Sequence, residues 1–167
     1  DAKEMHESNV ASEAEYYLLT FLEVEYPTDE TIERAETVME KIYAKSKYTV
    51  GTGSKTKDGD FVVEVTVSPL DLYNLLTDDD YSDTWDSVTG DMDYDTVTEE
   101  EYAAADAAYA ARMLDLLEDR LDDVEYGKDQ TVMLQLKADE DGYYVLVDTG
   151  MQKVDEVMVD YSGAYSK

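Results

Sequence analysis

The sequence predicts an α+β fold, with an antiparallel sheet of about four strands and helices packed mainly on one face. Apolar residues recur with helical spacing in some segments and alternate with a period of two in others. The alternating segments form two pairs, each containing an Asp-Gly step typical of a tight hairpin turn, at residues 58–59 and 141–142. A length of 167 residues suits one domain, so a single domain over residues 1–167 is expected.

The first part of the chain predicts a helical hairpin. Residues 9–25 place an apolar stripe on one helical face, made of Ala14, Tyr17, Leu18, Phe21 and Leu22. Ser12 and Glu15 have the spacing of a capping box. After a proline turn, Thr28 can cap a second helix over about 29–46. The stripe of this second helix is Ile32, Ala35, Met39, Ile42 and Tyr43.

The next segments predict the first strand pair. Residues 48–56 and 60–67 read as strands joined at an Asp-Gly turn. In the second strand one face holds Phe61, Val63, Val65 and Val67, and the other holds Val62, Glu64 and Thr66. Ser68 and Pro69 have the pattern of a helix start, which predicts a short helix to about Leu76.

An acidic, aperiodic stretch over residues 77–97 reads as a linker. A long helix is expected from about 99 to 124, because Thr98 and Glu101 form a capping-box pattern and Gly127 is placed to end it. Its apolar stripe is Tyr102, Tyr109, Met113, Leu116, Leu117 and Leu121.

The last segments predict a second strand pair and a final helix. Strands are expected over residues 130–138 and 142–149, and Thr149 with Gln152 can cap a last helix. The residues of this helix that face inward are Val154, Val157, Met158 and Tyr161.

The order of elements allows an internal duplication. Residues of about 10–76 and 98–162 would each form an α-β-β-α unit, joined by the acidic linker 77–97. The side chains of the two halves do not match at one constant offset, so the alternative of unrelated halves stays open.

The charge balance disfavours two classes of partner. With 42 acidic and 13 basic residues the formal net charge is −29, and no basic residue lies between Lys57 and Arg112. Such a field repels phosphate backbones and anionic lipid surfaces, so neither nucleic acid nor direct membrane binding is expected. A halophilic origin would also explain the charge.

Few residues offer catalytic chemistry. The chain has no cysteine, and its one histidine, His6, lies near the N-terminus without a predicted partner. No serine or threonine lies in a nucleophile motif, and no glycine pattern forms a phosphate loop. The sequence therefore predicts a protein that is not an enzyme and holds no cofactor. A hydrolase whose acids are hidden among the many carboxylates is left as an alternative.

One acidic stretch resembles a calcium loop. Asp91, Asp93 and Asp95 alternate as chelating carboxylates do, but an EF-hand loop also needs a glycine at its sixth position and a glutamate at its twelfth. These positions hold Thr96 and Tyr102. A solvated linker leading into a helix cap is therefore the favoured interpretation, and a metal site at the three aspartates is the alternative.

Aromatic residues supply the other candidate site. Trp85, the one tryptophan, lies between carboxylates and could stack with Tyr81 on a sugar or a cation, or could anchor a loose loop onto the core. A separate group of tyrosines is expected to be more exposed and to line a groove, namely Tyr16, Tyr26, Tyr48 and Tyr143.

Two stretches, "VEVTVSPLDLY" and "DEDGYYVLVD", carry a likeness that extends over most of residues 10–162. With them the chain resembles exported lipoproteins of Gram-positive anaerobes, many from the gut, a group without an established activity. The resemblance implies an extracellular, cell-surface location and attachment to the membrane only through an upstream lipidated cysteine. It transfers no catalytic residue.

The expected function is thus a non-enzymatic binding or scaffold module of a membrane-anchored lipoprotein, with an unknown protein or small molecule as its partner. The alternatives are a domain that captures a small ligand or carbohydrate through Trp85 and Tyr81, and a calcium-stabilised module.

Overall fold

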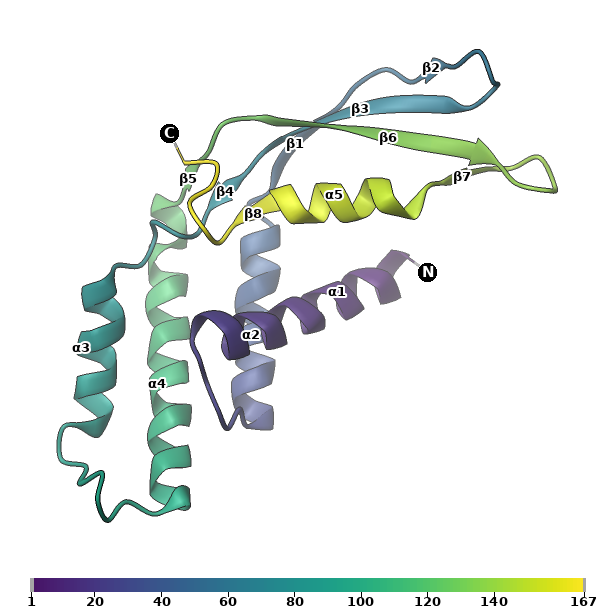
Figure 1. The fold of residues 1–167 in the computed structure, drawn as a ribbon. Coiled ribbons are helices and arrows are strands. Elements are labelled where there is room, and N and C mark those ends of the chain that lie inside the picture. The colour runs from purple at the N-terminus through teal and green to yellow at the C-terminus, as the bar shows by residue number, and fades with distance from the viewer. Residues whose placement is uncertain (1, 167) are drawn as a thin grey trace. The chain divides into compact units, whose positions relative to one another are not determined.

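A computed structural model describes residues 2–166, which form two compact units (Figure 1). Each unit is assembled from two separate stretches of chain. The helical unit combines the residues up to 44 with 75–123, and the strand unit combines 45–74 with the residues from 124 onward. Both units therefore draw on both halves of the sequence. The single domain and the internal duplication stay predictions.

The helical unit begins with the expected helical hairpin. Helix α1, Ala2–Tyr16, continues into a π-helical turn, η1, Tyr17–Phe21, and packs against α2, Asp29–Tyr43. Thr28 caps α2 as predicted, since its hydroxyl accepts a hydrogen bond from the Thr31 N–H at 3.1 Å. The capping box at Ser12 is wrong, because α1 begins well before it and Ser12 lies inside the helix.

The acidic stretch 77–97 is not only a linker. Helix α3 occupies Asp78–Thr89, and Thr77 and Asp80 form a reciprocal capping box at its start. The three aspartates of the first turn lie at the positive end of the helix dipole, which favours negative charge there. This overturns the prediction of an aperiodic linker for residues 78–89. A loop follows and leads into α4.

Helix α4, Glu99–Arg120, is the long helix that the sequence predicts, and Thr98 with Glu101 forms its capping box. A 3-10 turn, η2, Leu121–Asp123, extends it, so the chain leaves the helix before Gly127. Helix α4 packs against both α2 and α3 (Figure 1). The buried apolar residues of α4 are Ala105, Tyr109, Ala110, Met113, Leu114 and Leu117.

The main sheet of the strand unit is antiparallel throughout, which confirms the α+β fold class. Its order is β1-β3-β6-β7, and the short β2 pairs with β3 beyond the end of β1. Both predicted Asp-Gly turns are present, with positive φ at Gly59 and Gly142. The strands are β1 Lys47–Val50, β2 Ser54–Lys55, β3 Phe61–Ser68, β6 Gln130–Ala138 and β7 Tyr144–Leu146.

Helix α5, Asp148–Met158, lies along one face of this sheet and packs on β3 and β6 (Figure 1). The core cluster between this helix and the sheet consists of Val65, Val67, Val132 and Val154. The alternation of β3 is therefore as predicted. The cap is not at Thr149: α5 begins after Val147, whose side chain makes no capping hydrogen bond.

A second, smaller sheet replaces the short helix predicted for residues 69–76. Its strands are β5 Glu125–Tyr126, β4 Leu70–Asp71 and β8 Val159–Asp160, with β4 and β8 parallel. Ser68 ends β3 and does not cap a helix. The Asp71 carboxylate instead accepts hydrogen bonds from the backbone and side-chain N–H groups of Asn74, which closes a turn.

Candidate functional site

The strand unit carries a groove between α5 and the sheet, here called the apolar groove. Its volume is about 270 Å³. The residues that line it are Tyr48, Val50, Val65, Leu134, Met151, Val154, Asp155 and Met158.

Two sequence patterns build the apolar groove. Tyr48 and Val50 alternate along β1, and their register partners on β3 are Val67 and Val65, so these side chains share the face that α5 covers. Met151, Val154 and Met158 recur at helical spacing along α5. The helix is centred on β3 and β6, and the β1 side of the sheet face is left open.

Apolar side chains in the groove remain accessible to water. Tyr48 is 58% exposed, Val50 62% and Met151 41%. Asp155 contributes the one carboxylate among the lining residues, and its partial burial raises its pKa. The groove can thus bind apolar groups of a ligand, and Asp155 can form an ion pair with one positively charged group at its edge.

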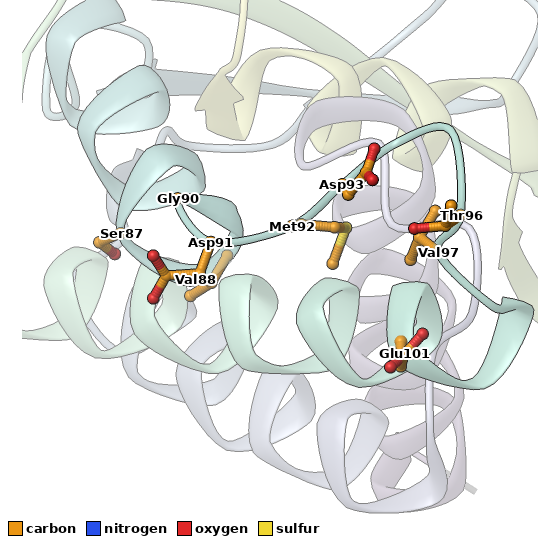
Figure 2. A pocket seen from close by; sticks show the side chains of 9 residues that line it. All are labelled: Ser87, Val88, Gly90, Asp91, Met92, Asp93, Thr96, Val97 and Glu101. Atoms are coloured by element: carbon orange, nitrogen blue, oxygen red, sulfur yellow. The ribbon is translucent and has the colours of Figure 1, made fainter.

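The helical unit holds a second hollow, the acidic cavity, with a volume of about 630 Å³. Figure 2 shows it between the end of α3, the following loop and the first turn of α4. Its lining residues are Ser87, Val88, Gly90, Asp91, Met92, Asp93, Thr96, Val97 and Glu101.

Two of the three predicted metal ligands line the acidic cavity. Asp91 and Asp93 do so, and their carboxylates point in different directions in Figure 2, whereas Asp95 is not part of the lining. The Asp93 carboxylate accepts a hydrogen bond from the Asp95 N–H at 3.1 Å. Within residues 2–166, no three His, Cys, Asp or Glu side chains are grouped so that they could hold an ion. The calcium hypothesis stays a prediction.

Glu101 is already engaged in the helix cap. Its carboxylate accepts hydrogen bonds from the backbone N–H and the hydroxyl of Thr98, both at 2.9 Å, and these bonds lower the pKa of Glu101. This acid stabilises the start of α4.

Trp85 packs α3 against α4. Its ring meets Tyr102 and Tyr109 of α4 edge-on, with centroids 5.9 and 5.4 Å apart. Tyr81, one turn earlier on α3, shares a hydrogen bond with Tyr17, and burial raises the pKa of both phenols. These contacts support the anchoring interpretation of Trp85. Ligand capture by Trp85 and Tyr81 stays a prediction.

The exposure expected of four tyrosines is confirmed, and a place in the groove is confirmed for one of them. Tyr16, Tyr26, Tyr48 and Tyr143 are all exposed, and Tyr48 lines the apolar groove. Sequence reasoning missed Met151 and Asp155, because a helix packed on a sheet is expected to bury its whole apolar stripe. The alternation of Tyr48 and Val50 at the start of a strand was the available signal.

Comparisons with known proteins give one informative likeness. No protein-family model matches the chain, and no curated protein matches it in sequence. Its structure is similar to the crystal structure of YcdA, a putative lipoprotein from Bacillus subtilis, with a TM-score of 0.56 and 16% sequence identity. The two proteins share a fold. The likeness covers 95% of this chain but 46% of YcdA, so the chain spans less than half the length of that protein.

None of the helices within residues 2–166 has both the length and the hydropathy required to cross a membrane.

Proposed function

We propose that this chain is the folded part of an exported, membrane-anchored lipoprotein, and that it acts there as a non-enzymatic binding module. The apolar groove is its binding surface. The observation that carries this proposal is a groove lined by apolar side chains that stay exposed beside a sheet edge. Concave surfaces that are mostly apolar and carry a few polar groups are typical of ligand sites on folded proteins.

Two independent likenesses support the lipoprotein part of the proposal. The fold is similar to that of YcdA. The stretches at residues 63–73 and 139–148 resemble exported lipoproteins of Gram-positive bacteria. Since neither likeness supplies a ligand, the binding role rests on the groove.

The lining of the groove supports binding over catalysis. Its eight residues include one titratable acid, Asp155, and a tyrosine, without a histidine, a serine or a lysine. The acid-base pairs of many enzymes combine two titratable groups whose surroundings push their pKa values apart. An apolar surface with one charge is suited to holding a ligand.

Export and lipidation are tested on the full gene product with its natural upstream sequence. It is expressed in a Gram-positive host that is fed an alkyne-tagged fatty acid. The expected result is a labelled protein in the membrane fraction that protease digests on intact protoplasts. An unlabelled protein protected inside the cell would overturn the lipoprotein proposal.

Binding at the groove is tested with Nile red, a neutral dye that fluoresces in apolar surroundings. The dye should bind the native protein, and Val50→Lys should weaken that binding because Val50 lines the groove. Val145→Lys is the matched control, since Val145 is exposed on the opposite sheet face. Equal binding by both variants would show that the dye lies elsewhere.

A further inference from the structure

We propose that the apolar groove accepts an extended polypeptide segment that adds as an antiparallel strand to the open edge of β1. The segment carries apolar side chains on its groove side and one Lys or Arg that pairs with Asp155. This inference rests on the proposed binding function and names the partner class of the same groove.

The backbone of β1 is arranged for strand addition. In the described part of the chain β1 pairs only with β3, so it is an edge strand. Gly51 donates its N–H to the Glu64 carbonyl at 2.7 Å, which makes these two residues a hydrogen-bonded pair. Hydrogen-bonded and non-hydrogen-bonded pairs alternate in an antiparallel ladder. The N–H and C=O groups of Tyr48 and Val50 therefore point away from β3, to the open edge.

The side chains of the same two residues connect this edge with the groove. Tyr48 and Val50 lie on the face that α5 covers, and both line the groove. A strand added beside them places its directly opposite residues on that same face. Main-chain hydrogen bonds at the edge and apolar pockets for alternate side chains are the two components of peptide recognition by strand addition.

The net negative charge of the chain favours a basic peptide over a second copy of this chain as the partner. A second copy of this chain would have the edge available too, but each copy carries a formal charge of −29 and the two would repel each other. A segment with a Lys or Arg is attracted to the same field. Asp155 on the groove wall provides the specific partner for one such residue.

The test uses a pool of dye-labelled heptapeptides with the pattern Thr-X-Thr-X-Thr-Lys-Thr, where X is Val, Ile, Leu or Phe. Binding is measured by fluorescence anisotropy on the whole chain, and the strongest peptide is then resynthesised. N-methylation of its two X residues removes the N–H groups that would face Tyr48 and Val50. Because each net hydrogen bond contributes roughly 1 kcal/mol and two are lost, affinity should fall about thirtyfold. N-methylation of the intervening threonines, whose N–H groups point away, should have a smaller effect.

Variants of the protein test the same geometry. Val50→Pro removes an N–H that faces the open edge, so the pairing with β3 is kept and the peptide affinity should fall. Asp155→Lys should also weaken binding. Glu156→Lys changes the net charge equally but lies outside the groove lining, so its effect should be smaller. Circular dichroism confirms that each variant is folded.

The outcomes separate the two proposals. If Nile red occupies the groove but peptide binding is absent, or is insensitive to N-methylation and to Val50→Pro, strand addition is wrong and the binding groove stands. If neither dye nor peptide responds to Val50→Lys, the groove itself is not a binding surface. A dimer that Val50→Pro dissolves would assign the edge to a second copy and overturn the choice of partner.

Discussion

Individual carboxylates differ sharply in what they do, although the sequence gives 42 nearly interchangeable acids. Asp160 is 1% exposed, and it accepts hydrogen bonds from the backbone N–H groups of Ser162, Ala164 and Tyr165 at 2.8–3.1 Å. Asp106, buried in α4, accepts one from the Tyr26 N–H at 2.8 Å. Such acids tie loops to the core. Their roles could not be predicted, because a buried carboxylate and a solvated one look alike in a sequence.

Asp160→Asn should lower the free energy of unfolding by about 2–3 kcal/mol, since an amide group replaces one of the two accepting oxygens and presents N–H groups to N–H groups. Urea denaturation measures the change. Glu156→Gln removes the same charge from an exposed site on α5 and serves as the control. A loss that is equal in both variants would contradict the role given to Asp160.

Calcium should not stabilise the protein, because Asp91, Asp93 and Asp95 are not gathered around one point. An ion that binds the native state raises Tm by mass action, so millimolar CaCl₂ should leave Tm within about 1 °C of its value in EDTA. MgCl₂ at the same concentration controls for general screening. A rise with calcium alone that Asp93→Asn abolishes would restore the calcium-stabilised module.

At low pH the ion pair between α3 and α4 should weaken. The Arg120 guanidinium donates to both Asp80 oxygens at 2.6 Å, and this pairing holds the pKa of Asp80 well below its usual range. A carboxylate whose pKa is lowered on folding contributes stability above its unfolded pKa of about 3.9, and this contribution is lost as pH falls toward the folded pKa.

The difference in unfolding free energy between the native chain and Asp80→Asn should therefore be about 1–2 kcal/mol at neutral pH and should shrink below about pH 4. Urea titrations at several pH values measure it. A difference that stays constant down to pH 3 would show that the pairing with Arg120 is not its source.

At the scale of elements, long periodic segments were predictable and acidic or short ones were not. Helices α2 and α4 and strands β3 and β6 agree with the predictions, because their apolar periods are long and their caps are explicit. Helix α3 was missed because its spaced apolar positions, Tyr81, Trp85 and Val88, are hidden among aspartates. The sequence predicts a helix in place of strand β4 because Ser68 and Pro69 match a helix start, whereas the pairing of Leu70 with Val159 is not visible locally.

Trp85→Ala should destabilise the packing of α3 on α4. The substitution removes the ring that meets Tyr102 and Tyr109, and the loss should be about 2–4 kcal/mol because large aromatic side chains in contact with a core cost this much on truncation. Thermal unfolding measures it, with Trp85→Phe as the conservative control. An unchanged Tm would instead favour a surface role in ligand capture.

The apolar groove was only partly predictable. Exposure of Tyr48 followed from the sequence, but the groove needs the placement of α5 over β3 and β6, which is a tertiary property. No local pattern specifies which part of a sheet face a helix leaves uncovered.

For the molecule as a whole, the negative charge is concentrated in one unit. The stretches 1–44 and 75–123 of the helical unit hold 29 acidic and five basic residues, a net of −24. The stretches of the strand unit hold 13 acidic and eight basic residues, a net of −5. Self-repulsion therefore opposes folding chiefly in the helical unit.

Raising NaCl from about 20 to 500 mM should raise Tm by several degrees, because the Debye length falls from roughly 20 Å to under 5 Å. The rise should be smaller at pH 4, where many carboxylates bind protons. Hydrogen exchange should show the larger gain in protection in α2 and α4. A chain that folds only in molar salt would show the halophilic origin that the sequence leaves open.

The interleaving of the two units also sets an order of events during synthesis on the ribosome. Strand β3 leaves the exit tunnel early, yet β6, which pairs with residues 61–67 of β3, is made only after residues 69–129. In that interval a valine-rich strand edge is bare and could pair with a neighbouring nascent chain. The segment translated meanwhile is the most acidic of the protein, and its charge opposes contact between neighbouring nascent chains until β6 is made.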